Sequence, residues 1–448
     1  MFLTLFIVLA ISSLWFSYKK PSIAFALMLC TFSIEQWFQS KDVFFLSHGS
    51  LINFTIGFII IVSLLLRLFN NFRYQEMFTQ TSWFVFALYI YTSASVLWSP
   101  VSDIAIDNFL HAIPYIVLSV LISPLLISNK EDAYDAGKYL VIFGSIIVVC
   151  LLFFADWGYR RILMAGLVGD ARANPLAIAN MAGYVLFASI LFNFKKEFKY
   201  WNVLKWLVVL LCLGIAVKTG SRGQFLLMIF LSMFLLPLSR PINQLKKILP
   251  VMFGFLVILV GSYWAMDTFT SDYNQVENAR WDADRMGDDV AGRFDAASNL
   301  INTWYDSPAN VLFGLGSSAS YDPAIAGFYT HIVPLEILGE LGIIGFTLFL
   351  FILYMVFKAF RRSIVHTKGD LTARGILATF SAIALFEFLL SFKQGSFLGS
   401  QFLFCMLVVL PKLEKSFEQS VKSTDIQERD TLQNELPNKF TYIGVKLK

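Results

Sequence analysis

The sequence is poor in charge. Of its 448 residues only 15% are Asp, Glu, Lys or Arg, whereas 57% are hydrophobic and 16% are aromatic. A soluble chain of this length carries closer to about a quarter charged residues, so the composition excludes an ordinary soluble domain and indicates a chain solvated mostly by lipid. The apolar runs approach the roughly 20 residues that a spanning helix needs, which excludes the short alternating strands of a membrane barrel.

Cysteine is also scarce. The four cysteines lie far apart, each within an apolar run, with no CxxC or histidine-paired spacing. This pattern excludes a disulfide framework and a cysteine metal site, and it predicts small apolar fillers. The first twenty residues lack a basic start and a small-residue cleavage site, so we expect a retained first helix rather than a signal peptide.

Long apolar runs make up most of the chain. They cover about 1–16, 22–39, 51–66, 81–97, 107–127, 139–155, 175–193, 203–217, 224–239, 248–266, 332–357, 374–392 and 397–411. The runs predict an all-α polytopic integral membrane protein with about 12–13 transmembrane helices. No repeat is visible, so the sequence does not indicate a solenoid or an inverted-repeat transporter.

Lysine and arginine divide the loops into two sets. Alternate short loops hold about seventeen in one set and seven in the other, and cytoplasmic loops keep the excess. A polar island at 267–331, with ten acidic residues, three arginines and no lysine, then faces the periplasm or cell exterior. We therefore expect helices at 1–266, a large, partly helical periplasmic loop at 267–331 between the tenth and eleventh helices, further helices at 332–411, and a flexible cytoplasmic tail at 412–448.

Lysines and arginines on the exterior side are unusual, because cytoplasmic loops normally hold the excess of positive charge, so a functional or structural role is expected for them. They cluster in YRR and GDAR, in KTGSRG and in the island, and they include Arg160, Arg161, Arg172, Lys218, Arg222 and Arg293. In KTGSRG two glycines bracket Arg222, whose guanidinium can bind phosphate oxygens in a bidentate manner, and Ser221 can cap the next helix. A snorkelling interfacial arginine beside turn glycines is the alternative.

His331 ends the island, where a neutral imidazole can accept a proton from an attacking hydroxyl; a histidine capping the next helix is the alternative. Glu336 and Glu340 follow on that helix, and carboxylates at such depth need partners, so either can orient His331 or pair with an arginine; a purely structural ion pair is the alternative. Arg293 begins an amphipathic stretch and is a phosphate-ligand candidate, unless a neighbouring aspartate pairs with it.

The run WDADRMGDD suggests a divalent metal bridging a diphosphate. It lacks the spaced ligands of an EF-hand loop, and a solvated acidic segment explains it adequately.

Five motifs occur in an order that resembles the O-antigen ligase and O-antigen polymerase superfamily. They are ASVLWSPVSDIAIDNFLHAIPYI, GDARANPLAIANMAGY, TGSRGQFLL, GRFDAASNLINTWYDSPANVLFGLG and THIVPLEILGELGIIGF, between roughly residues 95 and 395. The order is more specific than any single motif. One position departs from the family, which usually has Asn after the loop histidine, where this chain has Ile332.

The resemblance implies a multi-pass glycosyltransferase of the bacterial inner membrane, with its active site facing the periplasm. In such enzymes a glycan moves from undecaprenyl diphosphate to an acceptor hydroxyl on a glycan or on the lipid A core, without a metal or cofactor. Arg222 and Arg293 would bind the diphosphate and His331 would act on the acceptor hydroxyl. Arg172 would add a phosphate contact, and Arg160 and Arg161 would give electrostatic support. Lys218, in the KTGSRG turn, is a further substrate-binding candidate. Partners would be these glycans and membrane lipids, and not nucleic acid.

A lipid-linked oligosaccharide flippase or another polytopic transporter is the alternative. Glu35, Glu387 and the Asp107 and His111 pair favour it, because charges within spanning helices mark transport paths. A long polar loop and arginines confined to one side favour the glycosyltransferase.

Overall fold

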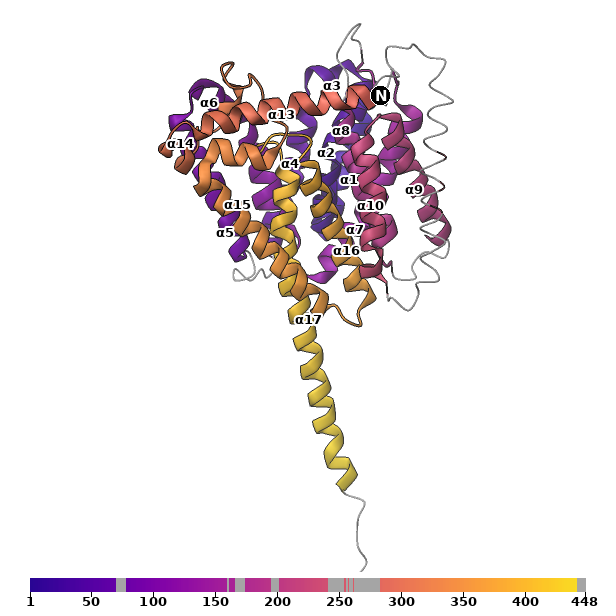
Figure 1. The fold of residues 1–448 in the computed structure, drawn as a ribbon. Coiled ribbons are helices and arrows are strands. Elements are labelled where there is room, and N and C mark those ends of the chain that lie inside the picture. Colours follow the sequence, from indigo (N-terminus) through magenta and orange to yellow (C-terminus); the bar gives the residue numbers. More distant parts are fainter. Residues whose placement is uncertain are drawn as a thin grey trace, which may run out of the picture.

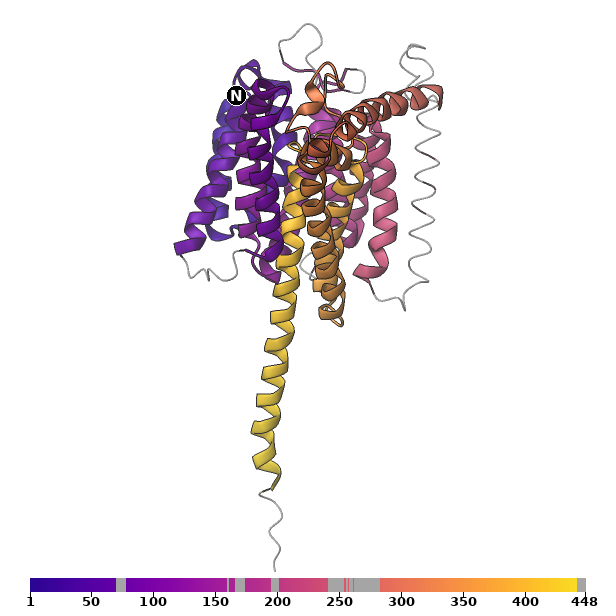
Figure 2. The same cartoon turned by 60° about the vertical axis from the view of Figure 1, so that its left-hand side comes forward.

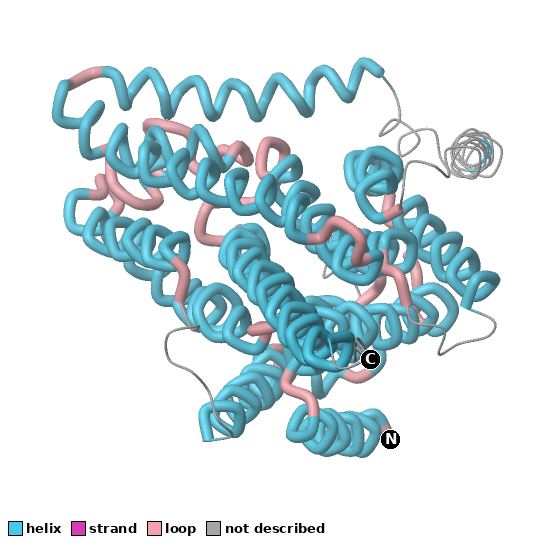
Figure 3. The backbone as a smooth tube through the Cα atoms, turned by 90° about the horizontal axis from the view of Figure 1, so that it is seen from below, coloured by secondary structure: helices cyan, strands magenta, loops and turns pink. Residues whose placement is uncertain are grey.

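The computed structural model describes residues 1–69, 78–158, 161–165, 174–194, 201–240 and 283–440, together with the single residues 254, 257 and 261. Within these ranges the side chains of 201–203, 283–291, 293 and 423–440 are not described. Viewed along the bundle (Figure 3), the described chain consists of helices joined by loops.

Most helices run along a common axis (Figures 1 and 2). In chain order the α-helices are α1 (Phe2–Lys19), α2 (Ser22–Lys41), α3 (Val43–Ser47), α4 (Ser50–Phe69), α5 (Gln80–Ser95), α6 (Ser102–Tyr115), α7 (Lys130–Val149), α8 (Pro175–Leu191), α9 (Trp201–Lys218), α10 (Arg222–Ser239), α13 (Ala283–Tyr305), α14 (Pro308–Phe313), α15 (Val333–His366), α16 (Leu371–Leu390) and α17 (Gln401–Phe440). Short 3-10 or π-helical segments are η2 (Val96–Trp98), η3 (Ile116–Ile122), η4 (Ser123–Leu126), η5 (Cys150–Phe154) and η8 (Ala319–Tyr321).

The all-α polytopic class predicted from composition is confirmed. In the described ranges, seven helices are long and apolar enough to cross a membrane by length and composition. The predicted run 248–266 lies outside the described residues, apart from three single positions. The run 175–193 forms α8, which has only 17 residues, of which thirteen are buried. Neighbouring helices rather than lipid therefore surround α8.

Side chains begin several of these helices. Asn129 Oδ1 accepts a hydrogen bond from the Asp132 amide at the start of α7. Asp370 Oδ1 accepts from the Thr372 and Ala373 amides at the start of α16. These contacts satisfy backbone donors that the first helical turn leaves without a partner.

The two ends of the bundle differ. Helix α13 lies across one end, whereas α17 projects from the other (Figures 1 and 2). Near the α17 end, ion pairs join loops that the lysine and arginine count assigns to the cytoplasm: Lys20–Asp135 (2.8 Å), Arg67–Asp132 (2.5 Å) and Lys130–Asp370 (2.8 Å). Helix α17 continues to Phe440, so most of the segment expected to be a flexible tail is helical.

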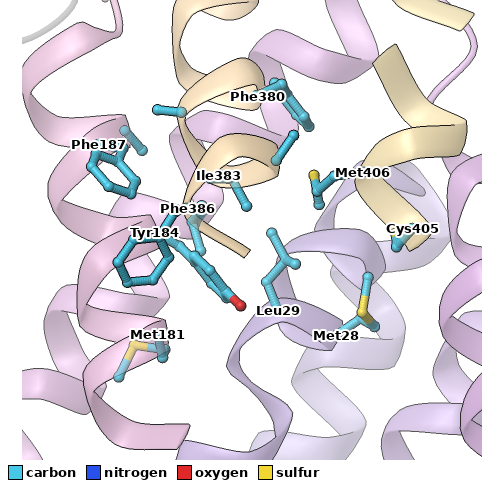
Figure 4. Close-up of a cluster of buried hydrophobic side chains, with 14 of the residues drawn as sticks. Met28, Leu29, Met181, Tyr184, Phe187, Phe380, Ile383, Phe386, Cys405 and Met406 are labelled. Carbon is cyan, nitrogen blue, oxygen red and sulfur yellow. The ribbon is translucent and has the colours of Figure 1, made fainter. Parts of the chain in front are cut away.

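The core forms where α2, α8, α16 and α17 meet. Figure 4 shows Met28 and Leu29 from α2 facing side chains of the other three helices. The four cysteines carry free thiols, and Cys30, Cys212 and Cys405 are buried among apolar side chains, as the sequence predicts.

A kink in α15 positions the loop that precedes this helix. Gly342 has φ of 63° within α15, a conformation that favours glycine. A β-carbon at Gly342 would lie 2.5 Å from the Leu312 carbonyl oxygen. The amides of Leu315 and Gly316 donate to the carbonyls of Gly339 and Glu340, both at 2.9 Å. The loop after α14 is thereby fixed against the first turns of α15.

Candidate functional site

Three adjoining cavities lie among the helices and loops. Cavity A, of about 390 Å³, is lined by residues that include Gln36, Asn180, Tyr184, Tyr329, Glu387 and Gln394. Cavity B, of about 230 Å³, is lined by residues that include Asn108, Tyr321, Glu336, Glu340, Ser396 and Gln401. Cavity C, of about 240 Å³, is mainly apolar and is lined by residues that include Phe54, Gly57, Leu110, Tyr115 and Leu118.

Shared residues join these cavities. Gly399 and Gln401 line both cavity A and cavity B. His111 and Tyr115 line both cavity B and cavity C, and Phe32 and Phe402 line both cavity A and cavity C. Two polar spaces therefore adjoin one apolar space.

The turn that carries Arg222 joins α9 to α10. Gly220 has φ of 66°, so glycine ends α9 in the left-handed conformation. Arg222 is half-buried and is the first residue of α10, beside amides that favour an anion. The expectation that the Ser221 side chain caps α10 is wrong, because its hydroxyl accepts a hydrogen bond from Thr219 Oγ1 at 3.0 Å instead.

The loop between α16 and α17 brings the Arg222 turn close to the start of α15. Lys393 packs so closely on Gly223 that a β-carbon there would collide with Lys393 Nζ. Gln224 Nε2 donates to Gln394 Oε1 at 2.7 Å, and the Val333 amide donates to the Ser391 carbonyl at 2.8 Å. Segments 222–224, 391–394 and 331–333 thus meet beside cavity A.

His331 lies in this meeting region. Its backbone has φ of 61°, which is uncommon for a residue other than glycine. Its ring contacts Tyr329 edge-on, with centroids 4.2 Å apart, and Tyr329 lines cavity A. The Tyr329 ring also lies 6.3 Å from that of Tyr321, which lines cavity B. His331 therefore contacts the wall of cavity A through Tyr329.

Tyr321 is a hydrogen-bond donor beside cavity B. Burial, together with the nearby Glu336, Glu340 and Tyr329 side chains, raises the pKa of the Tyr321 phenol to about 12. The phenol therefore stays protonated at neutral pH and can donate a hydrogen bond.

Two further predicted residues lie in segments that meet beside Trp157. Lys218 Nζ lies 4.7 Å from the centroid of the Trp157 ring, a cation–π contact. Trp157 pairs with Ile162 in a short antiparallel bridge, next to Arg161. The structure thus brings Lys218 and the Arg161 segment together.

The side chains of the remaining predicted cations lie outside the part of the chain that the structure describes. Arg160 and Arg172 lie outside the described residues. Arg293 belongs to α13, but its side chain is not described. Helix α13 itself packs on α15, with Ala297 and Leu300 buried, as its amphipathic pattern predicts, whereas Phe294 of the same apolar pattern is 59% exposed.

The expectation that Glu336 or Glu340 pairs with an arginine or orients His331 is wrong for the contacts described. Glu340 accepts from the Ser318 amide (2.7 Å), the Ser320 amide (3.1 Å) and Ser320 Oγ (2.7 Å). Glu336 Oε1 accepts from the Phe397 amide at 2.9 Å. Both carboxyls thus bind loop backbone, because loops that fold back on α15 bring amides within reach.

Cavity A also contains residues to which the sequence analysis gives no role in glycosyl transfer. Glu387 accepts hydrogen bonds from the Tyr184 hydroxyl and from Asn180 Nδ2. In the sequence, Lys393 and Gln394 belong to a short polar loop between two apolar runs, which by itself indicates no site. Their position next to α10 depends on a contact between loops about 170 residues apart, which no local pattern indicates.

A metal site is not evident among the described residues, in which no group of three or more His, Cys, Asp or Glu residues is close enough to hold an ion. The acidic run 281–289 lies outside the described side chains.

Fold and site define a polytopic α-helical membrane protein with polar cavities near one end of its helix bundle. Residues 207–350 match the family model for O-antigen ligase, which confirms the resemblance that the motifs indicate. The matched segment includes the Arg222 turn, α13 and the start of α15. This match supports membrane glycosyl transfer of the ligase or polymerase type as the general activity.

Comparisons with curated proteins and with solved structures add less information than the family match. No curated protein matches the chain. One chain of a solved structure, described as "Structural coordination of polymerization and crosslinking by a peptidoglycan synthase complex", is similar to this chain with a TM-score of 0.41 and 14% identity. The match covers 75% of this chain and 95% of that chain.

Proposed function

We propose that this protein transfers a glycan from undecaprenyl diphosphate to an acceptor hydroxyl at the periplasmic face of the bacterial inner membrane. The acceptor is another lipid-linked glycan or the lipid A core, so the enzyme is a polymerase or a ligase. Arg222 and Arg293 bind the diphosphate, and His331 is the base. The proposal includes about 12–13 spanning helices and an exterior loop at 267–331.

The meeting of three loop segments beside cavity A supports this proposal most. Segments 222–224 and 391–394 bring Arg222 and Lys393 to the start of α10. The same 391–394 segment contacts Val333, two residues after His331. The two cations can stabilise the negative charge of a departing diphosphate. The imidazole at the same end of the helix bundle can accept the proton of the attacking hydroxyl.

The proposed reaction is a single displacement that needs no metal. The acceptor oxygen attacks the anomeric carbon and forms the new glycosidic bond while the bond from that carbon to the phosphate oxygen breaks. The acceptor proton goes to His331, and undecaprenyl diphosphate leaves with the electron pair. Arginine guanidinium groups and the amides at the start of α10 stabilise the charge that develops on the leaving oxygen.

Cavity C offers a route for the polyprenyl chain. Its wall includes Phe54 and Leu110, which are 72% and 59% exposed on the outside of the bundle. In a membrane such apolar side chains contact lipid, so the lipid tail can enter between α4 and α6 without crossing a polar surface. Cavity C adjoins cavity A at Phe32 and Phe402.

Transfer by purified protein, in the presence of EDTA, tests the proposal. An undecaprenyl-diphosphate glycan and a glycan acceptor are expected to give product, and Arg222→Ala, Arg293→Ala or His331→Ala is expected to lower the rate by at least about a hundredfold. Arg222→Lys is expected to fall between, since it keeps the charge and loses the planar fork. The matched control is Arg361→Ala, at the cytoplasmic end.

Two results would contradict parts of this mechanism. Strict dependence on an added divalent cation would refute the metal-free mechanism. Full activity of the His331→Ala protein would remove the general-base role, even if the arginine variants were inactive.

A further inference from the structure

Glu336 has one carboxyl oxygen without a donor. The side chain is 3% exposed, and Oε1 accepts from the Phe397 amide. Oε2 is also buried and accepts no hydrogen bond from any residue that the structure describes. A polar atom buried inside a membrane protein without a partner is unfavourable, so a ligand that donates a hydrogen bond to this oxygen would be stabilised.

The neighbouring Glu340 does not share this property. It lies one turn later on α15 and accepts three hydrogen bonds from the loop at Ser318 and Ser320. Glu340 therefore holds the loop, whereas Glu336, which also lines cavity B, keeps one oxygen that can still accept a hydrogen bond.

The other groups in cavity B define the chemistry of a ligand. Asn108, Tyr321, Ser396 and Gln401 offer hydroxyls and amides, and the described lining residues include no Lys or Arg. Two glutamates in the wall disfavour an anion such as phosphate. A neutral molecule with several hydroxyl groups fits this lining, and the volume of about 230 Å³ suits a single sugar ring.

We propose that cavity B is a subsite for one sugar ring, which donates a hydroxyl hydrogen to Glu336 Oε2. This inference rests on the proposed function, because the shared residues Gly399 and Gln401 place the ring next to cavity A, where the glycosidic bond is formed. The ring belongs to the acceptor or is the first sugar of the donor, and both present the same hydroxyl chemistry.

Direct binding of monosaccharides to the purified full-length protein tests the subsite without any lipid donor. The probes are D-glucose, D-galactose, N-acetyl-D-glucosamine and L-rhamnose, followed by saturation-transfer difference NMR. We expect at least one to bind, with about tenfold weaker binding in Glu336→Ala. Ser396→Trp, which fills the cavity from a half-buried loop position, is expected to abolish binding.

Glu35→Gln is the matched control. Glu35 is also a carboxyl within the bundle, but Gln39 and Asn53 already donate to its two oxygens and it does not line cavity B. We expect this variant to bind sugar as the wild type does. Failure of every sugar to bind the wild type, or equal binding by the wild type, Glu336→Ala and Ser396→Trp, would overturn the subsite.

The transfer assay separates this inference from the proposed function. In Glu336→Gln the single oxygen can still accept from the Phe397 amide, but the amide nitrogen that replaces Oε2 cannot accept from the sugar. In this variant and in Glu336→Ala, a rise in KM for the acceptor alone assigns the ring to the acceptor, and a rise for the donor alone assigns it to the donor. Normal transfer with both KM values unchanged in Glu336→Ala would refute the subsite and leave the function intact. Sugar binding by a wild-type protein that transfers no glycan would refute the function and leave the subsite intact.

Discussion

Gly314→Ala is expected to displace the loop that forms part of cavity B. Gly314 has φ of 82° and lies between α14 and the kinked start of α15. A β-carbon at this position would lie 2.5 Å from the Gly342 nitrogen and closer still to the Glu340 carbonyl oxygen. Both neighbours are backbone atoms, so they cannot move aside as a flexible side chain can.

The size of this effect has two parts. Gly314 combines its positive φ with ψ of 171°, and an alanine in this region costs about 1–3 kcal/mol. Overpacking against fixed neighbours costs about 1–3 kcal/mol more, so the total loss of stability is about 2–6 kcal/mol. Gly327 provides the matched control, because it has φ of 76° but its nearest non-neighbouring atom would be Pro323 Cα at 3.9 Å. Gly327→Ala should therefore cost only the first part.

The assay is unfolding of each purified variant in detergent, by heat and by denaturant, alongside sugar binding. Gly314→Ala should be less stable than Gly327→Ala by about 1–3 kcal/mol and should bind sugar less well, because Ser318 and Tyr321 follow the displaced residue. Equal loss of stability in the two variants would refute the reasoning, since it would mean that the contact with α15 contributes nothing.

Two further predictions concern stability. Tyr184→Phe removes a hydrogen-bond donor to the buried Glu387 and should lower stability by about 1–3 kcal/mol. Tyr89→Phe should be near neutral, because the Tyr89 hydroxyl has no hydrogen-bond partner among the described residues. Equal losses of stability in the two variants on thermal unfolding would contradict this prediction. Burial raises the pKa of Asp370, but hydrogen bonds from Lys130 and the α16 amides outweigh it and lower the pKa overall. The carboxylate thus stabilises the protein above the ordinary pKa of Asp and loses this contribution as pH falls through the lowered pKa. Asp370→Asn should therefore be less stable at neutral pH and less sensitive to acid, as unfolding midpoints across pH will show.

The sequence could predict the elements that depend on local pattern. Apolar runs become helices, and the stretch from Ala297 to Leu300 packs as its spacing indicates. The basic residues of alternate loops, such as Lys20 and Arg67, meet acidic residues near one end of the bundle. Each of these outcomes follows from hydrophobic periodicity or from the distribution of charge between loops.

Contacts between distant loops could not be predicted in this way. The motif TGSRGQ identifies Arg222 as a candidate, but nothing in it indicates that Lys393 and Gln394 pack against the same turn. The capping role expected of Ser221 failed because Thr219, two residues earlier, binds its hydroxyl instead. Side-chain hydrogen bonds of this kind depend on the final turn geometry, which residue type alone does not fix.

Glu336 and Glu340 show what the structure adds to motif reading. In the sequence they are equivalent, two carboxyls one turn apart on an apolar helix. In the structure the three donors to Glu340 satisfy it, so its replacement is expected to loosen the Ser318–Ser320 loop. Glu336 lines cavity B and has one unsatisfied oxygen, so its replacement is expected to change ligand binding more than folding. Because both carboxyls line the same cavity, their hydrogen-bond partners rather than their position distinguish the structural carboxyl from the one available to a ligand.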